Sequence, residues 1–326
     1  MTRPRIGFLG TGWIGRHRME AIIETGAVEA VGIADPSAEM AAEARKLAPE
    51  AALAEGIEEL LDLGLDGLVI ATPSALHAEQ SIAALERRVA VFCQKPLGRT
   101  AAEARAVVNA ARKADRLLAV DFCYRHQQGT ERIAELVRSG ALGRVFAADL
   151  VFHNAYGPDK PWFYDPVLSG GGCVMDLGVH LVDLALWMFD FPEVTDVQAK
   201  LFAGGEPLKG DKVEDYAVAQ ITLAGGISVR LACSWRLQAG QDAVIAAEFY
   251  GTGGGAAQRN VDGSFYDFEA RRFTGTARET IATPPDTWGG RAAADWARRL
   301  AAGERFDPAA DGLVRVAEVI DRIYGR

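Results

Sequence analysis

The feature that most constrains this chain is a glycine-rich turn, Gly10-Thr11-Gly12-Trp13-Ile14-Gly15, which joins a short apolar run to a helical stretch. The apolar run, Ile6 to Leu9, predicts a strand, and the stretch from Ile14 to Thr25 predicts a helix. A second predicted strand, Val28 to Ala34, ends at Asp35, twenty positions after the last glycine of the turn. This order of strand, glycine turn, helix, strand and acid predicts a dinucleotide site.

Each part of the turn has a physical task in such a site. Gly10 permits the tight turn, Gly12 lets the backbone approach a pyrophosphate, and Gly15 lets the helix pack closely on the strand. The helix N-terminus faces the phosphate charge. Asp35 would accept hydrogen bonds from the adenosine ribose and repel a 2′-phosphate, so we expect NAD rather than NADP. A glycine turn in a nucleotide-free α/β protein is the alternative interpretation.

Composition narrows the class of protein. A chain of 326 residues with 49% hydrophobic residues is long enough for two domains, each with a core. Its net charge of −9 argues against nucleic acid or an anionic membrane as a partner. The most apolar stretch, Val174 to Phe189, carries Asp176, His180 and Asp183, so we expect no membrane span. The first expected strand begins within a few residues of Met1, so we expect no signal peptide.

The cysteines indicate a reducing compartment. Four are scattered along the chain without a C-x-x-C pair: Cys93, Cys123, Cys173 and Cys233. We expect reduced, mostly buried thiols in a cytoplasmic protein.

Up to about Phe122 the chain alternates strand-like and helix-like segments, which predicts a parallel, doubly wound α/β sheet. The expected strands are Arg5–Leu9, Val28–Ala34, Gly67–Ala71, Val89–Cys93 and Leu117–Asp121, with helices such as Ala75–Arg88 and Ala101–Ala114 between them. Ligands of such sheets bind beyond the carboxyl ends of the strands, where Ala71-Thr72-Pro73 and Gln94-Lys95-Pro96 fall. We therefore expect a dinucleotide-binding domain over residues 1–122.

After Cys123 strands follow one another with few helices, which predicts a mostly antiparallel sheet in an α+β domain over residues 123–326. The expected strands are Val145–Phe152, Val194–Phe202, Asp215–Leu223, Gly226–Trp235 and Ala243–Tyr250. A hairpin is expected at Ala224-Gly225-Gly226 and a loop at Gly251 to Gly255. Helices are expected at Val174–Phe189, Ala292–Ala302 and Leu313–Tyr324. The site is expected in a cleft between the two domains.

Asp176 and His180 lie four residues apart after the glycine run Gly170–Gly172, so they share one face of the expected helix. Two titratable groups on an otherwise buried helix cost stability unless both are partnered, which suggests a task. One alternative is a zinc stripe of Cys173, Asp176 and His180, although no further cluster supplies the remaining ligands. The other is a satisfied core histidine beside an aspartate that bonds backbone donors.

Other polar and aromatic residues allow more than one interpretation. Lys95, at a strand end, could polarise a substrate oxygen or be a solvated loop lysine. His77 could approach the cofactor, or cap a helix or lie on the surface. Tyr124 and Arg125 could line the cleft, and a salt bridge between domains is the alternative for Arg125. Trp162 and Trp235 are expected to be packing residues rather than sugar platforms, although Trp162 lies just upstream of the glycine run.

Taken together, these motifs resemble the Gfo/Idh/MocA family, named for glucose–fructose oxidoreductase, inositol dehydrogenase and a rhizopine-catabolism protein. The resemblance covers nearly the whole chain, in the family's order: the Gly10–Gly15 turn, Ala71-Thr72-Pro73 with His77, Gln94-Lys95-Pro96, and Asp165-Pro166 leading to Ser169–His180 with Asp183. It implies a Rossmann domain followed by an α+β domain whose large open sheet supports homodimers or homotetramers. It also implies oxidation or reduction of sugars and polyols with NAD(P).

The resemblance carries the family's Lys–Asp–His catalytic set onto Lys95, Asp176 and His180, with no metal. We expect His180 to act as general base, Lys95 to stabilise charge on the reacting oxygen, and Asp176 to bind a substrate hydroxyl. The family usually has Glu-Lys-Pro, whereas this chain has Gln94, which keeps the length but loses a charge that favours the lysine's ammonium form. The alternatives are a non-enzymatic NAD- or sugar-sensing scaffold and an NADP-dependent sugar reductase.

Overall fold

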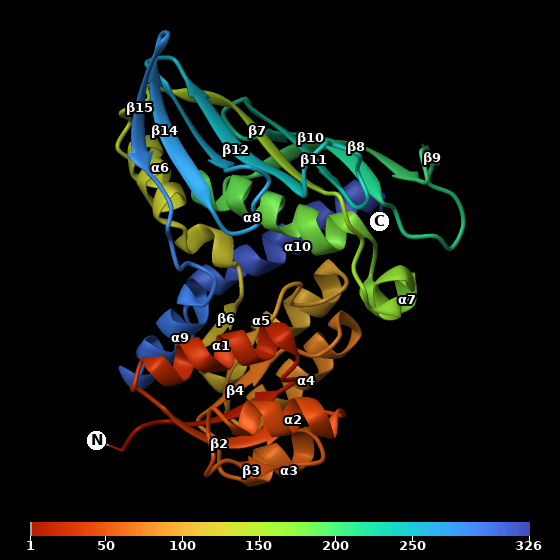
Figure 1. The fold of residues 1–326 in the computed structure, drawn as a ribbon, viewed down its shortest axis with the longest axis vertical. Coiled ribbons are helices and arrows are strands. Elements are labelled where there is room, and N and C mark those ends of the chain that lie inside the picture. The colour runs from red at the N-terminus through yellow and green to blue at the C-terminus, as the bar shows by residue number, and fades with distance from the viewer. Residues whose placement is uncertain (1) are drawn as a thin grey trace. The chain divides into compact units, whose positions relative to one another are not determined.

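The computed structural model describes residues 2–326, which form two compact units (Figure 1). The first contains the residues up to Cys123 together with Gly289–Val314, and the second contains Tyr124–Trp288 and Arg315–Arg326. One division thus lies beside the boundary expected at residue 122. The segment Gly289–Val314, which the sequence analysis grouped with the second domain, clusters with the first unit.

A six-stranded parallel sheet, in the order β3-β2-β1-β4-β5-β6, forms the centre of the first unit. Its strands are β1 (Arg5–Leu9), β2 (Glu29–Ala34), β3 (Ala52–Leu53), β4 (Gly67–Ile70), β5 (Ala90–Cys93) and β6 (Leu118–Val120). This is the doubly wound order of a Rossmann sheet, so the predicted fold class is confirmed here. All five expected strands are present to within one residue at each end, and the two-residue edge strand β3 was not predicted.

Six α-helices of the first unit are α1 (Trp13–Glu24), α2 (Ala38–Arg45), α3 (Ile57–Asp62), α4 (Ser74–Glu86), α5 (Ala101–Ala114) and α9 (Arg291–Ala301). The returning helix α9 packs on α1 and places the fully buried Trp296 against Phe92 of β5, with ring centroids 5.8 Å apart. Gly67 leaves room for this indole, because a Cβ there would lie 2.7 Å from its ring. The core of the sheet is therefore completed by a segment that is remote in sequence.

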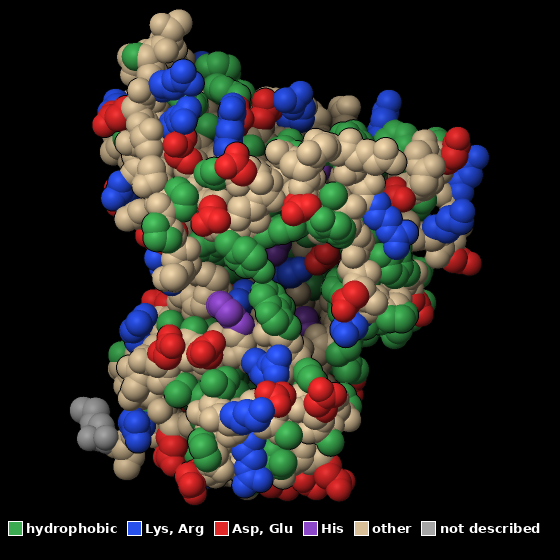
Figure 2. Space-filling view, in the orientation of Figure 1, with side chains coloured by type: hydrophobic (Ala, Val, Ile, Leu, Met, Phe, Trp, Pro, Cys, Tyr) green, Lys and Arg blue, Asp and Glu red, His purple; other side chains and the backbone are tan. Residues whose placement is uncertain are grey.

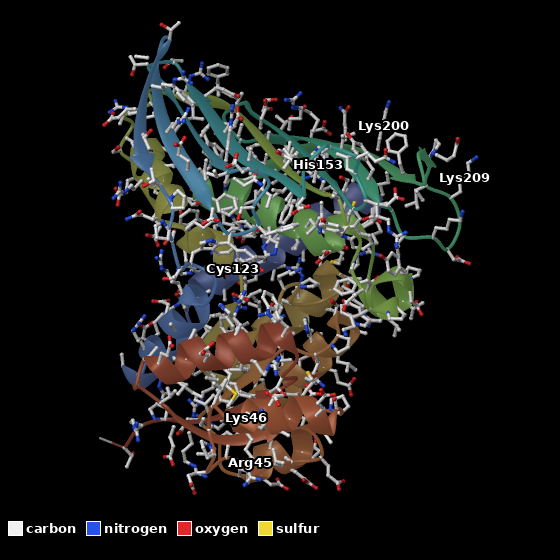
Figure 3. The ribbon with its side chains drawn as sticks, in the orientation of Figure 1. Arg45, Lys46, Cys123, His153, Lys200 and Lys209 are labelled. Atoms are coloured by element: carbon white, nitrogen blue, oxygen red, sulfur yellow. The ribbon has the colours of Figure 1, made fainter. Side chains whose placement is uncertain are left out.

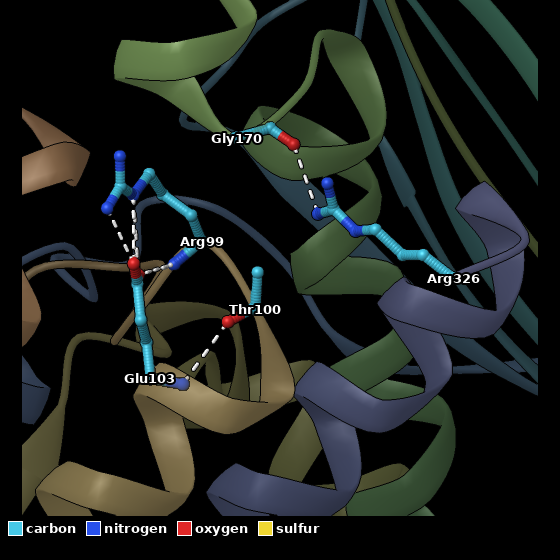
Figure 4. A network of polar contacts seen from close by, with 5 residues as sticks. All are labelled: Arg99, Thr100, Glu103, Gly170 and Arg326. Carbon is cyan, nitrogen blue, oxygen red and sulfur yellow. Dashed lines mark hydrogen bonds and ion pairs between the residues drawn. The ribbon is translucent and has the colours of Figure 1, made fainter.

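The start of α5 is fixed by side chains that follow the Gln94–Pro96 turn (Figure 4). Thr100 accepts a hydrogen bond from the Glu103 backbone N–H over 3.2 Å. Glu103 in turn accepts from the Arg99 backbone N–H over 2.7 Å and pairs with the Arg99 guanidinium. Reciprocal capping of this kind satisfies helix N–H groups that otherwise lack partners, and so fixes the chain where it leaves the turn.

The second unit is built on a nine-stranded sheet in the order β15-β14-β13-β12-β7-β11-β10-β8-β9. Its strands are β7 (Val145–Asn154), β8 (Val194–Ala203), β9 (Glu206–Pro207), β10 (Tyr216–Leu223), β11 (Ile227–Ser234), β12 (Ala243–Gly251), β13 (Gly255–Asn260), β14 (Phe268–Thr274) and β15 (Ala277–Ala282). Every neighbouring pair is antiparallel except β7 with β11. The mostly antiparallel sheet, its five expected strands and the β10–β11 hairpin are confirmed; β9 and β13–β15 were not predicted.

One edge of this sheet ends at β9, which has two residues and contains a proline. Lys200 on β8 and Lys209 beyond β9 lie at this end of the sheet (Figure 3). Short strands, proline and lysine all discourage an edge from pairing with other strands. In the space-filling view, acidic and basic side chains are interspersed over each unit (Figure 2).

Helices cover one face of the large sheet. The α-helices of the second unit are α6 (Gln128–Arg138), α7 (Pro166–Ser169), α8 (Val179–Met188) and α10 (Asp311–Tyr324), the last of which is divided between the units after Val314. Of these, α6 contacts β13, β14 and β15. Figure 1 shows α6 and α8 beneath the strands, and α8 contacts β7 and β11. The single α-helix expected over Val174–Phe189 is wrong at its start, because Val174–Gly178 forms a π-helical turn before α8 begins. The apolar pattern could not reveal this turn, since nearly every residue in the stretch is buried and apolar.

The stretch Pro166–Met188 is long and apolar enough to cross a bilayer by length and composition, and it is the one such stretch within residues 2–326. Of its most apolar window, 83% is buried inside the structure. Burial of that extent is typical of a core helix, so the stretch is weak evidence for a membrane span.

Candidate functional site

The glycine turn between β1 and α1 has the geometry of a phosphate-binding turn. Gly10 has φ of +82°, and a Cβ there would lie 2.6 Å from the Ala71 carbonyl oxygen. A Cβ at Gly15 would lie 2.1 Å from the Gly10 carbonyl oxygen. At Gly12, in contrast, a Cβ would meet nothing within 4 Å. The backbone at Gly10 and Gly15 requires glycine for its own packing, whereas Gly12 faces open space into which a ligand can come.

The first turn of α1 offers its N–H groups to that space. Gly12 is the N-cap and supplies no side-chain hydrogen bond, and the first turn contains no acidic residue. Trp13 and Ile14 are 59% and 36% exposed, which is unusual for large apolar side chains. An uncapped helix N-terminus attracts anionic groups, so this turn fits a dinucleotide pyrophosphate.

Asp35 lies directly after β2 and is held beside the turn. Its Oδ2 accepts from the backbone N–H of Thr11 over 2.6 Å, and its Oδ1 accepts from the Ser37 N–H over 2.9 Å. A carboxylate has about four acceptor positions, so Asp35 retains capacity for ribose hydroxyl groups. The half-buried Ala71 and Thr72 follow β4 at the same edge of the sheet.

His77 joins two of the loops that the sequence singled out. Its Nδ1 lies 2.6 Å from the Pro96 carbonyl oxygen, and its Nε2 lies 2.7 Å from the Thr72 carbonyl oxygen. The ring is buried, so the alternative of a surface role is wrong. Burial lowers the pKa of His77, outweighing the two carbonyl groups, which raise it, and Lys95 lowers it further. The histidine ties the turn after β4 to the turn after β5.

Lys95 is half-buried in the turn that follows β5, one residue after the buried Gln94. The Gln94 side chain donates from Nε2 to Oδ2 of Asp121 over 2.6 Å, and Arg18 Nε donates to the same oxygen over 2.6 Å. Because parallel strands end at one edge, the glycine turn, Asp35, Thr72 and Lys95 all lie at the carboxyl edge of this sheet.

In the second unit, Asp176 lies in the π-helical turn and His180 in the first turn of α8. Oδ2 of Asp176 accepts a hydrogen bond from Trp235 Nε1 over 3.0 Å. The buried His180 ring packs on Tyr124, with ring centroids 4.9 Å apart. Tyr124 is buried as well and packs on Trp288 at 4.9 Å. π-Helical turns often occur at functional sites, and this one carries the aspartate of the expected pair.

Arg125 pairs with the buried Asp183 of α8, through Nε to Oδ2 at 2.7 Å and a second, shorter contact. Its guanidinium also lies over the rings of Trp187 and Phe191. Burial raises the pKa of Asp183, and the arginine opposes this. This salt bridge lies within the second unit, because both partners belong to it, whereas the alternative interpretation of Arg125 was a salt bridge between the domains.

An aromatic cluster surrounds the indole that binds Asp176. Trp162 is half-buried and stacks on Phe163 with centroids 3.8 Å apart. Phe163 and Tyr164 both approach Trp235 edge-on, at 6.3 Å and 5.6 Å. Trp235 is thus a packing residue, as expected, and also a hydrogen-bond donor to the site.

Glu214 was not predicted from the sequence. It is a buried carboxylate that holds the glycine run and the start of the π-helical turn before α8. It accepts from the Gly172 and Val174 N–H groups, at 3.0 Å and 2.8 Å, and from the Tyr324 hydroxyl at 2.8 Å. Burial raises its pKa, although these donors lower it. The glycine run makes room for this contact, because a Cβ at Gly172 would lie 1.9 Å from the Glu214 carbonyl oxygen.

The cysteines are all buried and without disulfides. Cys173 Sγ lies 3.8 Å from Cys233 Sγ, and burial raises the pKa of the Cys173 thiol. Within residues 2–326, no group of three or more His, Cys, Asp or Glu side chains is arranged to hold a metal ion.

Comparisons with known proteins match both halves of the chain. Residues 4–122 match the family model of the oxidoreductase family with an NAD-binding Rossmann fold, and residues 130–257 match that of the GFO/IDH/MocA C-terminal domain. D-glucoside 3-dehydrogenase of Escherichia coli K12 is 30% identical over 209 residues, which is 60% of this chain and 60% of that relative. The match therefore spans less than two thirds of that relative's length.

Two further proteins are similar over more of their length. Inositol 2-dehydrogenase of Acidothermus cellulolyticus is 29% identical over 318 residues, covering 94% of this chain and 87% of that protein. A solved structure of levoglucosan dehydrogenase with NADH and levoglucosan has a TM-score of 0.85 at 21% identity, covering 99% of this chain and 96% of that one. This last likeness concerns the fold. Because domains of one family match both halves, the chain belongs to the Gfo/Idh/MocA family of oxidoreductases.

Proposed function

We propose that this protein is an NAD-dependent oxidoreductase that transfers hydride between nicotinamide and a carbinol or carbonyl carbon of a sugar or cyclic polyol. The observation that carries the proposal is the glycine turn, which excludes a Cβ at Gly10 and Gly15 yet leaves Gly12 open, at the same sheet edge as Lys95. The names of the relatives, a glucoside and an inositol dehydrogenase, support the substrate class.

The cofactor would be held by residues at the carboxyl edge of the six-stranded sheet. They are Gly10, Thr11, Gly12, Trp13, Ile14, Gly15, Asp35, Ala71, Thr72, Pro73, His77, Gln94 and Lys95. When bound, NAD supplies the hydride acceptor or donor. His77 acts here through the loops it joins, since both of its ring nitrogens face backbone carbonyl groups.

Three side chains would act on the substrate. We assign His180 as the general base that takes the hydroxyl proton, a task that suits a neutral imidazole near pH 7. The Lys95 ammonium group stabilises negative charge on the reacting oxygen. Asp176, held by Trp235, binds a substrate hydroxyl. Tyr124 and Trp162 shape the surroundings of this pair, and Arg125, paired with Asp183, supports α8.

The test is a panel of aldoses, inositols and ketosugars incubated with NAD⁺, with NADH formation read by absorbance. On the best substrate, His180→Asn and Lys95→Met are each expected to lower turnover by about 10²–10⁴-fold. Lys200→Met, on β8, is the matched control and should keep wild-type turnover. Full activity of His180→Asn would overturn the role of the base, and no turnover on any member of the panel would favour a sensor.

The choice of NAD over NADP rests on Asp35, whose carboxylate would repel a 2′-phosphate. Fluorescence titrations with NADH and NADPH are expected to show the tighter binding for NADH. Asp35→Asn should reduce the difference between the affinities for NADH and NADPH. Equal affinities for the two cofactors in the wild type would refute the preference.

Assembly and location follow as proposals from the same assignment. We propose that residues 1–122 bind the dinucleotide and residues 123–326 bind substrate, with the nine-stranded sheet forming a homodimer or homotetramer in the cytoplasm. Light scattering coupled to size exclusion measures the oligomer mass, and a monomer at micromolar concentration would contradict the assembly.

A further inference from the structure

A buried polar cluster lies directly behind Lys95. It consists of Arg18 of α1, Gln94 after β5 and Asp121 after β6, which are 6%, 9% and 1% exposed. One oxygen of Asp121, Oδ2, accepts from both Arg18 Nε and Gln94 Nε2, each over 2.6 Å. The other oxygen, Oδ1, is buried and has no hydrogen-bond partner within residues 2–326.

The backbone fixes the position of this carboxylate relative to the lysine turn. Strands β5 and β6 pair in parallel with Cys93 opposite Val120, and the Asp121 N–H donates to the Cys93 carbonyl oxygen over 2.9 Å. Asp121 therefore lies beside Gln94, at the point where β5 ends and the turn to Lys95 begins. Both positions belong to the first unit.

The chemistry of the cluster explains why residue 94 is an amide. A carboxylate can only accept hydrogen bonds, so Asp121 orients Gln94 with its NH₂ group inward. A glutamate at this position would bring two carboxylates to hydrogen-bonding distance, where both cannot be ionised without a large cost. Glutamine at residue 94 and aspartate at residue 121 are thus complementary.

The charge of Asp121 is felt around the turn. Burial raises the pKa of the Cys123 thiol to about 12, with Asp121 raising it and Arg18 and Lys95 lowering it. The same thiol therefore lies within the fields of both the carboxylate and the lysine. Two further groups near the turn are held towards their neutral forms, because burial lowers the pKa of His77 and raises the pKa of the Cys93 thiol to about 12.

We propose that Asp121 is a positioning residue of the site: it supplies the buried negative charge that Gln94 lacks and, through the Gln94 amide, fixes the turn that presents Lys95. Arg18 balances the buried charge and anchors it to α1, the helix that begins at the glycine turn. This inference rests on the proposed function only in that Lys95 is the group that acts on substrate.

The test is a double-mutant cycle with wild type, Gln94→Glu, Asp121→Asn and the combined variant. Each single substitution is expected to lower kcat by about 10- to 100-fold, with KM for the sugar changed much less. The combined variant, which restores one carboxylate and one amide, should recover to within about threefold of wild type. The proposal would be overturned if kcat of the combined variant fell by the product of the two single losses. Wild-type kcat in Asp121→Asn would overturn it as well.

A second measurement needs no substrate. Competitive acetylation with acetic anhydride, read by peptide mass spectrometry, reports how reactive each lysine side chain is in the folded protein. Lys95 is expected to label faster in Asp121→Asn than in wild type and to return towards the wild-type rate in the combined variant, while the exposed Lys46 stays constant. An unchanged Lys95 rate would refute the role of Asp121 even if the enzyme assay finds no substrate.

If Asp121→Asn does not fold, Gln94→Met replaces it in both measurements. Methionine keeps the chain length and leaves the Arg18–Asp121 pair intact, but it removes the amide. We expect a folded protein with lowered kcat, and wild-type kcat would overturn the proposal. Failure of the wild type on every substrate, with the labelling pattern as expected, would refute the proposed function alone.

Discussion

The indole of Trp235, at the end of β11, donates a hydrogen bond to Asp176 in the π-helical turn, joining sheet and helix over 3.0 Å. The two residues are 59 positions apart in sequence. Trp235 is buried, whereas Asp176 is half-buried, so a buried donor anchors a carboxylate residue that is itself partly exposed. This is the arrangement expected of an acceptor that must keep one orientation while it binds a hydroxyl group.

Trp235→Phe tests this anchor. Phenylalanine keeps most of the aromatic packing but removes the charge-assisted hydrogen bond, which is worth about 1.5–3 kcal/mol. We expect KM for the sugar to rise about tenfold or more while NADH binding stays unchanged. Trp187→Phe, on α8, is the control for the loss of an indole that does not bond to Asp176. Steady-state kinetics of both variants on the best substrate measure the change in KM. Equal effects of the two substitutions would show that the hydrogen bond has no special role.

The glycine turn yields a paired prediction. Gly15→Ala is expected to destabilise the protein, because its Cβ would lie 2.1 Å from a backbone oxygen that cannot move away easily. Gly12→Ala meets open space at φ of −57°, so its melting temperature should match wild type. If the pyrophosphate binds there, the added methyl group weakens NADH binding although the fold is intact. Thermal unfolding and NADH fluorescence titration measure the two effects, and unchanged affinity in Gly12→Ala would place the cofactor elsewhere.

The fold could be predicted wherever burial leaves a simple pattern. Strands of the parallel sheet are buried on both faces and appear as continuous apolar runs, so their positions followed from the sequence. Two of the last strands of the second sheet were missed because β13 carries only small and polar residues and β15 is mostly exposed, so neither shows an apolar strand pattern. The π-helical turn could not be predicted because it changes hydrogen bonding and leaves the apolar pattern intact.

The site could be predicted only where its residues are close in sequence. The glycine turn, the Gln94–Pro96 turn and the Asp176–His180 pair each lie within a few positions of one another. The residues that support them do not: Arg18 and Asp121 are 103 positions apart, and Val174 and Glu214 are 40 apart. Neither an isolated arginine on a helix nor a glutamate before a strand carries a signal that distinguishes it from a surface charge.

Glu214 leads to a prediction about stability. Tyr324→Phe removes one of its hydrogen bonds and should lower the free energy of unfolding by about 1 kcal/mol.

The same carboxyl group makes the stability depend on pH. Burial raises the pKa of Glu214 above its value in the unfolded chain, so the folded state holds the proton more tightly. Its contribution is therefore fully present below about pH 4.5 and is lost as the pH rises through the folded value. Glu214→Gln should remove this dependence in denaturant titrations, and an unchanged pH slope would contradict it.

His77 gives the opposite dependence on pH. Burial lowers the pKa of His77 from 6.5, outweighing the two carbonyl groups that its ring nitrogens face. The unfolded chain therefore binds more protons than the folded one between the folded pKa and about 6.5, so the stability that His77 contributes is present above this window and is lost as the pH falls through it. His77→Gln, which cannot take up the proton, should flatten the decline in unfolding free energy below about pH 6.5.

The control is His153→Gln. His153 lies on β7 (Figure 3), bonds to Ser234 and also has its pKa lowered by burial. Unlike His77, it belongs to the second unit and joins none of the loops of the first unit. Both substitutions should flatten the pH dependence, whereas only His77→Gln should also weaken NADH binding, since it alone loosens the Thr72 and Pro96 turns. Wild-type NADH affinity in His77→Gln would show that the two turns keep their positions without this histidine.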